Sequence, residues 1–241
     1  MREYFDRVYN KGKKNFYTFL EGKMKKNEKT FVVTANPETL MIANDNDKFK
    51  KCLLDDNTII VPDGIGVLKG ANMLGYKISE TITGVELCTE LFEYGNKHKK
   101  SIYLFGAKPE VVELLAKKIK IDYPNLKVLG YENGYVEDKN EAYKKIIELK
   151  PDIVLVAIGI PHQELLIYDN LKYFDKGIFM GVGGSFDVLS GTKKRAPKIF
   201  IKLKLEWLYR ITTEPKRLKR FFRSNVRYLG IIQKEKKEIK K

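Results

Sequence analysis

Short continuous apolar runs alternate with amphipathic stretches through residues 1–192, and this alternation constrains the fold more than any other feature. Each run is rich in Val, Ile, Leu and Phe and has the length of one β-strand. The runs cover residues 30–36, 58–64, 101–107, 126–132, 152–160 and 177–184. Strands that are apolar along their whole length are typical of a sheet covered by helices on both faces.

Helical patterns separate these runs. Residues 109–124 place Val112, Leu115 and Ile119 on one face with lysines opposite, and residues 140–150 repeat the pattern. Strands that alternate with helices of this length predict βαβ units. The sequence therefore predicts an α/β fold with a parallel sheet.

The charge divides the chain into two parts. The net charge is +15, and residues 193–241 hold eighteen Lys and Arg against four Asp and Glu. The division predicts a nearly neutral catalytic body over 1–192 and a basic C-terminal appendage over 193–241. The appendage mixes aromatic and aliphatic side chains with its cations and reads as helical, interrupted at Pro197 and Pro215. Such a pattern predicts an amphipathic segment that docks on an anionic membrane surface.

Nothing in the sequence resembles an export signal or a membrane span. The two cysteines, Cys52 and Cys88, have apolar neighbours and no metal-ligand spacing, which favours a reducing compartment. We therefore expect a cytoplasmic protein that is peripherally associated with the inner face of the membrane.

Polar residues follow the first two predicted strands, at the edge where an open parallel sheet binds ligands. Thr34 and Asn36 stand at the end of the first, and Asp63 stands between a proline and a glycine at the end of the second. Asp63 is placed for a general base or a ribose contact. Asn36 and Asp63 are equally suited to cap the helices that follow them.

Later strands end in glycine turns or amides. Gly106 opens a helix whose N–H groups suit a phosphate, and Gln163 and Glu164 follow the fifth strand with groups that can hydrogen-bond a sugar or a base. At the end of the sixth strand, Gly183 and Gly184 would let the backbone approach a ligand closely. Asp187 has a carboxylate that could accept a hydrogen bond from a ribose. A tight turn is the competing interpretation.

Two other chemistries fit the sequence less well. Asp45 and Asp47 form an Asp-x-Asp that resembles a divalent-metal motif, although a polar helix edge or a turn explains it better. The first strand lacks the GxGxxG that an NAD-dependent oxidoreductase would carry. A nucleic-acid-binding protein that uses the basic tail is the remaining rival.

Several of these segments together resemble one family, the WecG/TagA/CpsF glycosyltransferases. The matching stretches are 32–38, 61–67, 83–88, 102–113, 123–135, 158–164 and 181–221. The resemblance implies a Rossmann-like sheet with a C-terminal appendage and transfer of an N-acetylmannosamine-type sugar from a UDP donor. The implied acceptor is undecaprenyl-diphosphate-linked N-acetylglucosamine in wall teichoic acid linkage-unit synthesis, with inversion to a β-linkage. It implies no catalytic metal or other cofactor. A related UDP-sugar, such as a ManNAc uronic acid, is the alternative donor.

The resemblance also implies roles for individual residues. Thr34 and Asn36 line the pocket, Asp63 is the general base, and Gln163 contacts a sugar. The resemblance places Gly183, Gly184 and Asp187 on the nucleotide side of the substrate-binding set, to which the strand-end positions above add Gly106 and Glu164.

Three arginines of the tail complete the expected site. Arg210, Arg217 and Arg220 are spaced to share one helix face, where their guanidinium groups suit diphosphate oxygens. Lipid head groups are equally plausible partners. The chain departs from its relatives in residues 1–29, which read as helical rather than as a strand. It also departs at Thr81-Ile82, just before Thr83-Gly84, where relatives often carry a basic residue. Oligomeric state is open, and a homo-oligomer would cover the apolar tail.

Overall fold

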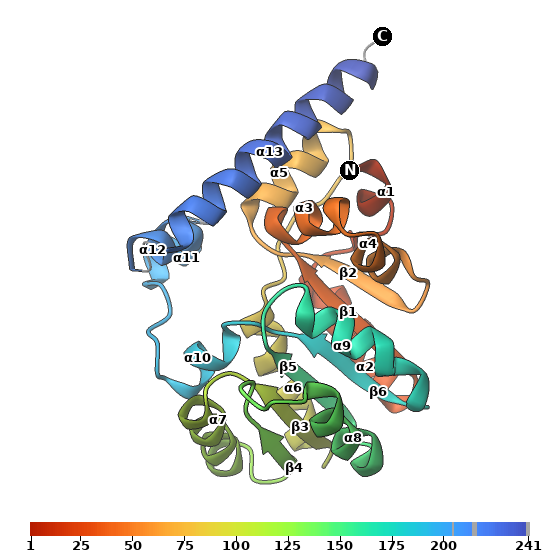
Figure 1. The fold of residues 1–241 in the computed structure, drawn as a ribbon, viewed down its shortest axis with the longest axis vertical. Coiled ribbons are helices and arrows are strands. Elements are labelled where there is room, and N and C mark those ends of the chain that lie inside the picture. Colours follow the sequence, from red (N-terminus) through yellow and green to blue (C-terminus); the bar gives the residue numbers. More distant parts are fainter. Residues whose placement is uncertain (204, 214–215, 240–241) are drawn as a thin grey trace.

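Six parallel strands form one sheet in the order β2-β1-β6-β5-β3-β4 (Figure 1). The computed structural model describes residues 1–203, 205–213 and 216–239. The strands are β1 (Lys29–Ala35), β2 (Thr58–Pro62), β3 (Ser101–Gly106), β4 (Lys127–Glu132), β5 (Ile153–Ala157) and β6 (Gly177–Gly181). Five lie within the predicted apolar runs and β1 begins one residue before its run, so the α/β, Rossmann-like prediction is confirmed.

Helices cover both faces of the sheet, because the strands are apolar on both. One layer consists of α1 (Arg2–Phe5), α3 (Pro37–Asp45), α4 (Asp47–Leu54), α5 (Ile65–Met73), α8 (Lys139–Leu149) and α9 (His162–Asn170), followed by the 3-10 turn η1 (Leu171–Tyr173). The other consists of α2 (Lys13–Lys25), α6 (Gly84–Lys97), α7 (Pro109–Asp122) and α10 (Ser185–Ser190). Alternate residues of β1, β2, β3, β5 and β6 feed the two cores, as in Val33 and Val32 of β1.

Residues 1–29 contain the helices α1 and α2, as expected in part, and the segment between these helices extends the sheet slightly. Between α1 and α2 the chain runs beside β2, where Val8 forms a single parallel bridge with Ile60. The Tyr9 N–H donates to the Ile60 carbonyl at 2.8 Å. The N-terminal segment thus covers the open edge of β2, which would otherwise expose unpaired backbone groups.

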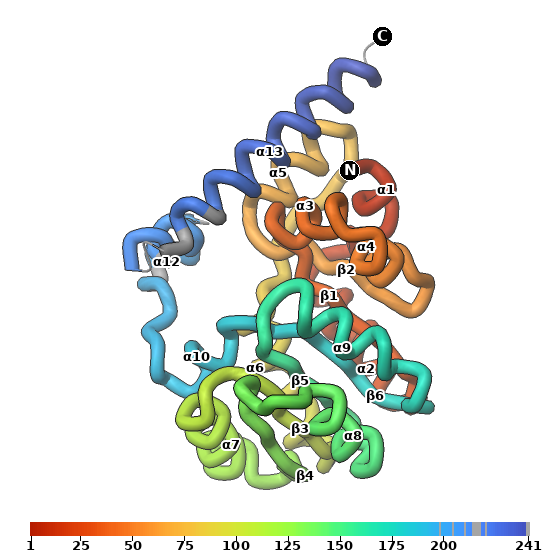
Figure 2. Tube along the Cα trace, in the orientation of Figure 1, coloured from red at the N-terminus to blue at the C-terminus, as the bar shows by residue number. Residues whose placement is uncertain are grey.

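The tail forms three helices, α11 (Lys198–Lys202), α12 (Glu206–Thr213) and α13 (Lys216–Ile239). The long helix α13 runs along α5 and α3 toward the N-terminus (Figures 1 and 2). Tyr228 and Ile232 of α13 are fully buried and belong to the same core as α3 and α5. The C-terminal half of α13 is therefore packed into the catalytic body, across the boundary predicted after residue 192.

A bidentate ion pair adds to this docking. Both guanidinium nitrogens of Arg227 reach the carboxylate of Asp45 at the end of α3. Within the described part of the chain, no helix has the length and apolar character needed to cross a bilayer.

Candidate active site

The carboxyl ends of β1 and β6 lie side by side, and the chain leaves them in opposite directions. β1 pairs with β6 in parallel, with Val33 opposite Gly181. After β1 the chain enters α3 in one helical layer, and after β6 it enters α10 in the other. Such a switch point opens a crevice where parallel α/β sheets bind ligands.

Asn36 stands at this point and caps α3. Its side-chain oxygen accepts from the Thr39 N–H at 3.0 Å, while the Thr39 hydroxyl accepts from the Asn36 N–H at 3.3 Å. This reciprocal pair is a capping box, so the helix-cap interpretation of Asn36 is confirmed. Thr34 lies two residues earlier in β1, half-buried beside Val61 of β2.

Asp63 follows β2 at the same edge of the sheet. Its backbone N–H donates to the Ala35 carbonyl at 2.8 Å, which places it next to the end of β1. The N-cap of α5 is Gly64, whose φ of 83° favours glycine, so Asp63 does not cap that helix. The carboxylate of Asp63 is half-buried and belongs to the turn beside the switch point.

Gln163 connects three parts of the site. Its side-chain oxygen accepts from the N–H of Gly159 at 3.2 Å and from that of Gly183 at 3.1 Å. Its side-chain nitrogen donates to the Glu164 carboxylate at 2.7 Å. Only 2% of Gln163 is exposed, so this amide serves to hold the loops after β5 and β6 together.

Glu164 lies beneath Gln163 and is also 2% exposed. Its second carboxylate oxygen, Oε2, has no hydrogen-bond partner among the residues that the structure describes. Burial raises the pKa of Glu164 to about 7, and the hydrogen bond from Gln163 opposes this only in part. A side chain so enclosed lies behind the substrate-facing surface.

The remaining glycines and Asp187 divide between two places. Gly183, with a φ of 47°, and Gly184 form the turn into α10, and the half-buried Asp187 lies in the first turn of that helix. Gly106 lies on β3, which β5 separates from β6. A Cβ on Gly106 would come within 2.4 Å of the Ala157 carbonyl oxygen. The close packing of β3 against β5 therefore accounts for glycine at this position.

The three tail arginines do not share one helix face, and that expectation is wrong. Arg210 belongs to α12, whereas Arg217 and Arg220 belong to α13. The sequence reason is Pro215, since a proline disfavours helix through the residue before it. The side chains of these three arginines lie outside the described residues.

Sequence reasoning missed a charged cluster centred on Glu86, near Asp63. Lys13 of α2 donates to Glu86 at 2.9 Å, and Arg195 approaches the same oxygen at 3.9 Å. The other oxygen accepts from the Thr83 hydroxyl at 2.8 Å. Burial raises the pKa of Glu86, but the hydrogen bonds from Lys13 and Thr83 outweigh it and leave the pKa lowered. The Thr83-x-x-Glu86 spacing of a capping box was the available signal.

The Ile82 N–H donates to the Pro62 carbonyl at 2.8 Å, and this bond brings the cluster beside the Asp63 turn. The cluster therefore links α2, the start of α6 and the beginning of the tail around one edge of the site.

Asp45 has a partner other than a metal. The hydrogen bond from Arg227 is the main cause that keeps the pKa of Asp45 lowered. Asn46 separates α3 from α4 and accepts from the Phe49 N–H at 2.9 Å, which makes this segment a helix junction. Among the described residues, no group of three or more His, Cys, Asp or Glu could hold a metal ion.

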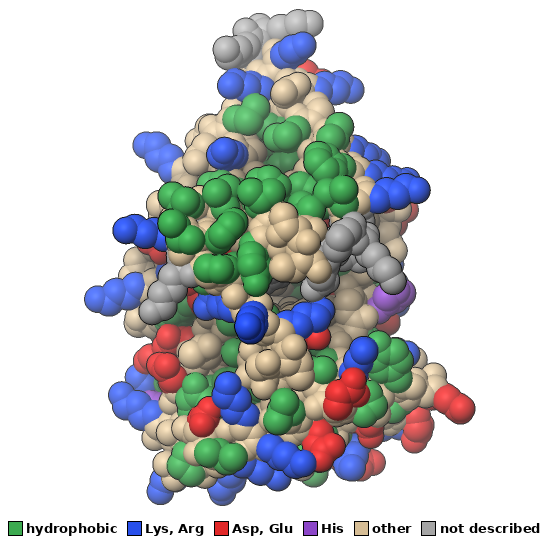
Figure 3. All heavy atoms as spheres, turned by 90° about the vertical axis from the view of Figure 1, so that its left-hand side faces the viewer, with side chains coloured by type: hydrophobic (Ala, Val, Ile, Leu, Met, Phe, Trp, Pro, Cys, Tyr) green, Lys and Arg blue, Asp and Glu red, His purple; other side chains and the backbone are tan. Residues whose placement is uncertain are grey.

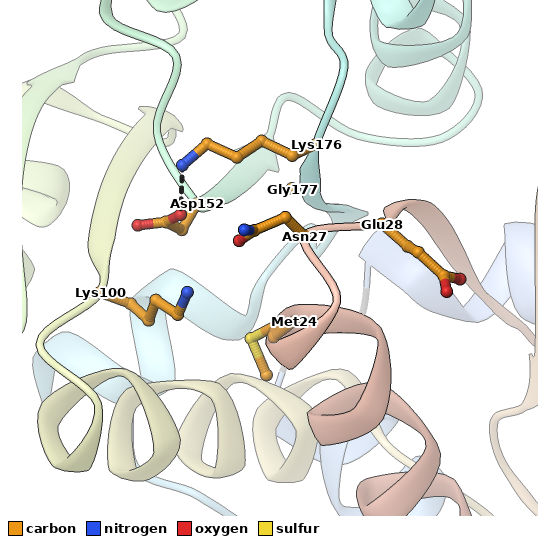
Figure 4. A pocket seen from close by; sticks show the side chains of 7 residues that line it. All are labelled: Met24, Asn27, Glu28, Lys100, Asp152, Lys176 and Gly177. Carbon is orange, nitrogen blue, oxygen red and sulfur yellow. Dashed lines mark hydrogen bonds and ion pairs between the residues drawn. The ribbon is translucent and has the colours of Figure 1, made fainter.

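A small polar hollow lies at the opposite, amino edge of the sheet (Figure 4). It is lined by Met24, Asn27, Glu28, Lys100, Asp152, Lys176 and Gly177. Lys176 donates to Asp152 at 2.8 Å, and Asp152 also accepts from the hydroxyl of Ser101. These bonds fasten the starts of three strands, and we assign the hollow a structural role.

The chain matches the model of the glycosyl transferase WecG/TagA/CpsF family over residues 7–241. The chain belongs to this family. The match to the WecG/TagA/CpsF model includes both the sheet and the tail helices, so the tail belongs to the part of the chain that defines the family.

Three curated relatives carry the name N-acetylglucosaminyldiphosphoundecaprenol N-acetyl-beta-D-mannosaminyltransferase. One from Bacillus subtilis (strain 168) is 41% identical over 206 residues, which cover 85% of this chain and 80% of the relative. One from Bacillus spizizenii is 37% identical over 88% of this chain and 81% of the relative. One from Staphylococcus aureus (strain NCTC 8325 / PS 47) is 36% identical over 94% of this chain and 88% of the relative.

Proposed function

We propose that this glycosyltransferase moves N-acetylmannosamine from UDP-N-acetylmannosamine to undecaprenyl-diphosphate-linked N-acetylglucosamine, in the synthesis of the wall teichoic acid linkage unit. The observation that carries the proposal is the placement of Asp63 at the switch point, one hydrogen bond from the end of β1. The names of the relatives supply the sugar and the acceptor.

In this proposal Asp63 is the general base. It takes the proton from the acceptor hydroxyl as that oxygen attacks the anomeric carbon, and the C–O bond to the diphosphate breaks. UDP leaves on the opposite face of the sugar, which inverts the anomeric carbon. Thr34 and Asn36 line the pocket, and the Gly183–Gly184 turn with Asp187 lies on the nucleotide side. Arg210, Arg217 and Arg220 are proposed to contact a diphosphate.

We further propose that the tail docks on the inner face of the cell membrane. Apolar side chains gather over one face of the molecule (Figure 3). On α11–α13 the exposed ones include Ile199, Leu203, Trp207, Leu208, Leu218, Phe222, Val226 and Leu229. Exposed cations, among them Lys202, Lys219 and Arg223, lie on the same helices. Each cation near an anionic leaflet contributes about 1 kcal/mol to binding.

A donor screen tests the chemistry. The purified chain is given a lipid-diphosphate N-acetylglucosamine acceptor and a set of UDP-sugars, and the product is identified by mass. We expect transfer from UDP-N-acetylmannosamine. Transfer only from another UDP-sugar would identify that sugar as the donor in place of UDP-N-acetylmannosamine. The absence of transfer from every UDP-sugar would contradict the proposal.

Sedimentation with vesicles tests the docking. We expect binding to vesicles that contain phosphatidylglycerol, weaker binding to neutral vesicles, and loss of binding when Phe222 and Val226 are both replaced by serine. Duplex DNA at the same salt concentration is the comparison, and tighter binding to DNA would favour a nucleic-acid partner. Light scattering without vesicles reports whether the chain forms a homo-oligomer.

A further inference from the structure

Both acceptor positions of the Gln163 carbonyl are occupied by backbone N–H groups, those of Gly159 and Gly183. The Gly183 N–H belongs to the turn that we assign to the nucleotide. Since a side-chain amide carries a carbonyl at one end and an NH₂ at the other, this arrangement holds only for one of its two orientations. The orientation of Gln163 therefore decides whether the Gly183 N–H has its partner.

Glu164 selects that orientation. Its Oε1 accepts from the Gln163 NH₂ at 2.7 Å, and an ionised carboxylate can only accept. If the amide were turned the other way, its carbonyl oxygen would face the Glu164 carboxylate. Its NH₂ group would then face the N–H donors of Gly159 and Gly183. Both side chains are 2% exposed, so water does not provide a ready alternative partner.

We propose that Glu164 is a positioning residue for the nucleotide loop: its buried carboxyl orients the Gln163 amide, and the amide holds the Gly183 N–H in place. The inference rests on the proposed function, in which this loop binds UDP. It removes Glu164 from direct contact with substrate, which its position after the fifth predicted strand had suggested.

Gly181, at the end of β6, gives the pair its space. A Cβ on Gly181 would lie 2.7 Å from the Gln163 nitrogen and 2.7 Å from the Glu164 oxygen. The φ of Gly181 is not in the left-handed region, so alanine suits its backbone. Gly181→Ala therefore disturbs the hydrogen bond between Gln163 and Glu164 without changing either side chain.

Burial is the main influence on the pKa of Glu164, opposed by hydrogen bonds from Gln163 and from its own backbone. The charged pair that α4 and α9 share, Lys48 with Asp169, lies at the exposed surface. From α4, Cys52 approaches α9, its sulfur lying 4.0 Å from the Glu164 carbonyl oxygen, and burial raises the pKa of this thiol so that it stays neutral. β6 contributes Gly181. Since the pKa of Glu164 is about 7, the carboxyl gains a proton in mildly acidic solution and then accepts less strongly.

The test compares Glu164→Leu, Glu164→Gln and Gly181→Ala in the full-length chain. Asp169→Asn, an exposed carboxylate on the same helix, and Gly22→Ala, which has open space around it, are the controls. Calorimetry measures the Kd of UDP, and amide hydrogen exchange of the unliganded protein reports the Gly183 N–H. Kinetics with the lipid-linked acceptor separate KM from kcat.

We expect Glu164→Leu and Gly181→Ala to weaken UDP binding about 10-fold, which is the loss of roughly one buried hydrogen bond, and to speed exchange at Gly183. KM for the donor should rise more than kcat falls. At pH 8 Glu164→Gln should bind UDP like the wild type, because its amide oxygen still accepts. As the pH falls from 8 to 6, wild-type affinity should drop more steeply than that of Glu164→Gln, which changes only as UDP itself gains a proton.

Wild-type UDP affinity in both Glu164→Leu and Gly181→Ala would overturn the inference, as would a Glu164→Gln variant no better than Glu164→Leu at pH 8. If Glu164→Leu does not fold, Gly181→Ala and the pH series of Glu164→Gln decide the matter by the same criteria. A wild-type chain that fails to bind UDP contradicts the proposed function instead. In that case, amide hydrogen exchange at the Gly183 N–H still shows whether the Glu164 carboxyl holds the loop after β6 in place.

Discussion

The Tyr228 hydroxyl donates to the Gly66 carbonyl at 3.3 Å, and this contact fastens the last helix of the chain to the helix that begins directly after the Asp63 turn. Tyr228 fits above Gly70, where a Cβ would lie 2.0 Å from the tyrosine oxygen. Gly66 in turn leaves room for Pro37 at the start of α3, since a Cβ there would lie 2.6 Å from the proline ring. The helices that follow Asn36 and Asp63 are therefore packed against each other and held by α13.

Replacing Gly70 with alanine should displace α13. The added methyl group would overlap the Tyr228 oxygen, and overpacking of this kind costs about 1–3 kcal/mol. Urea unfolding should show the loss, and Gly230→Ala, at an open position on α13, is the matched control. Equal unfolding free energies for Gly70→Ala and the wild type would mean that α13 does not rest on α5 in solution.

Asp63→Asn should fold normally and lose transfer by about 10² to 10⁴-fold, because an amide cannot take the acceptor proton. The control is Asp56→Asn, which changes an exposed carboxylate at the other end of β2. Turnover of the lipid-linked acceptor, measured beside UDP affinity, separates catalysis from binding. Wild-type turnover in Asp63→Asn would remove Asp63 from the role of base.

Glu164→Gln should make the protein more stable in alkaline solution. The folded-state pKa of Glu164 is raised from 4.5 to about 7, so the buried carboxyl lowers stability progressively as the pH rises from about 4.5 to 7 and fully above 7. The shift corresponds to about 3 kcal/mol at most. Unfolding at pH 8 and pH 4.5 should show the variant's advantage at pH 8 alone. An equal advantage at both values would show that the pKa is not raised.

The ion pair between Asp45 and Arg227 should contribute little by itself. Both side chains are 47% exposed, and pairs of this kind contribute about 0.2–1 kcal/mol. A double-mutant cycle with Asp45→Ala and Arg227→Ala should give a coupling in this range that falls in 1 M salt. A coupling of zero would leave Tyr228 and Ile232 as the main attachments of α13.

Removing residues 193–241 should leave a body that binds UDP weakly and turns over poorly. Because Tyr228 and Ile232 belong to the main core, we also expect this truncated chain to unfold at lower urea than the full chain. Sedimentation with anionic vesicles and turnover of the lipid-linked acceptor measure the remaining losses. Full activity without the tail would contradict its proposed part in membrane docking and in the site.

Local sequence patterns determined the strands, the helices α7 and α8, and the edge of the sheet at which Thr34, Asn36 and Asp63 lie. Continuous apolar runs and 3.6-residue periodicity are local signals, and the carboxyl edge of a parallel sheet follows from the order of elements. The charge pattern likewise separated a basic tail from a neutral body.

Only the tertiary structure decided how these parts meet. Nothing local shows that Gln163 uses its amide to hold Gly183, or that Glu164 is enclosed behind it, because the groups that bury them come from other strands. The same is true of Tyr228, which packs above Gly70 although the two residues are far apart in the sequence. Packing between distant segments sets burial, and burial determines whether a polar side chain faces the substrate or supports the residue that does.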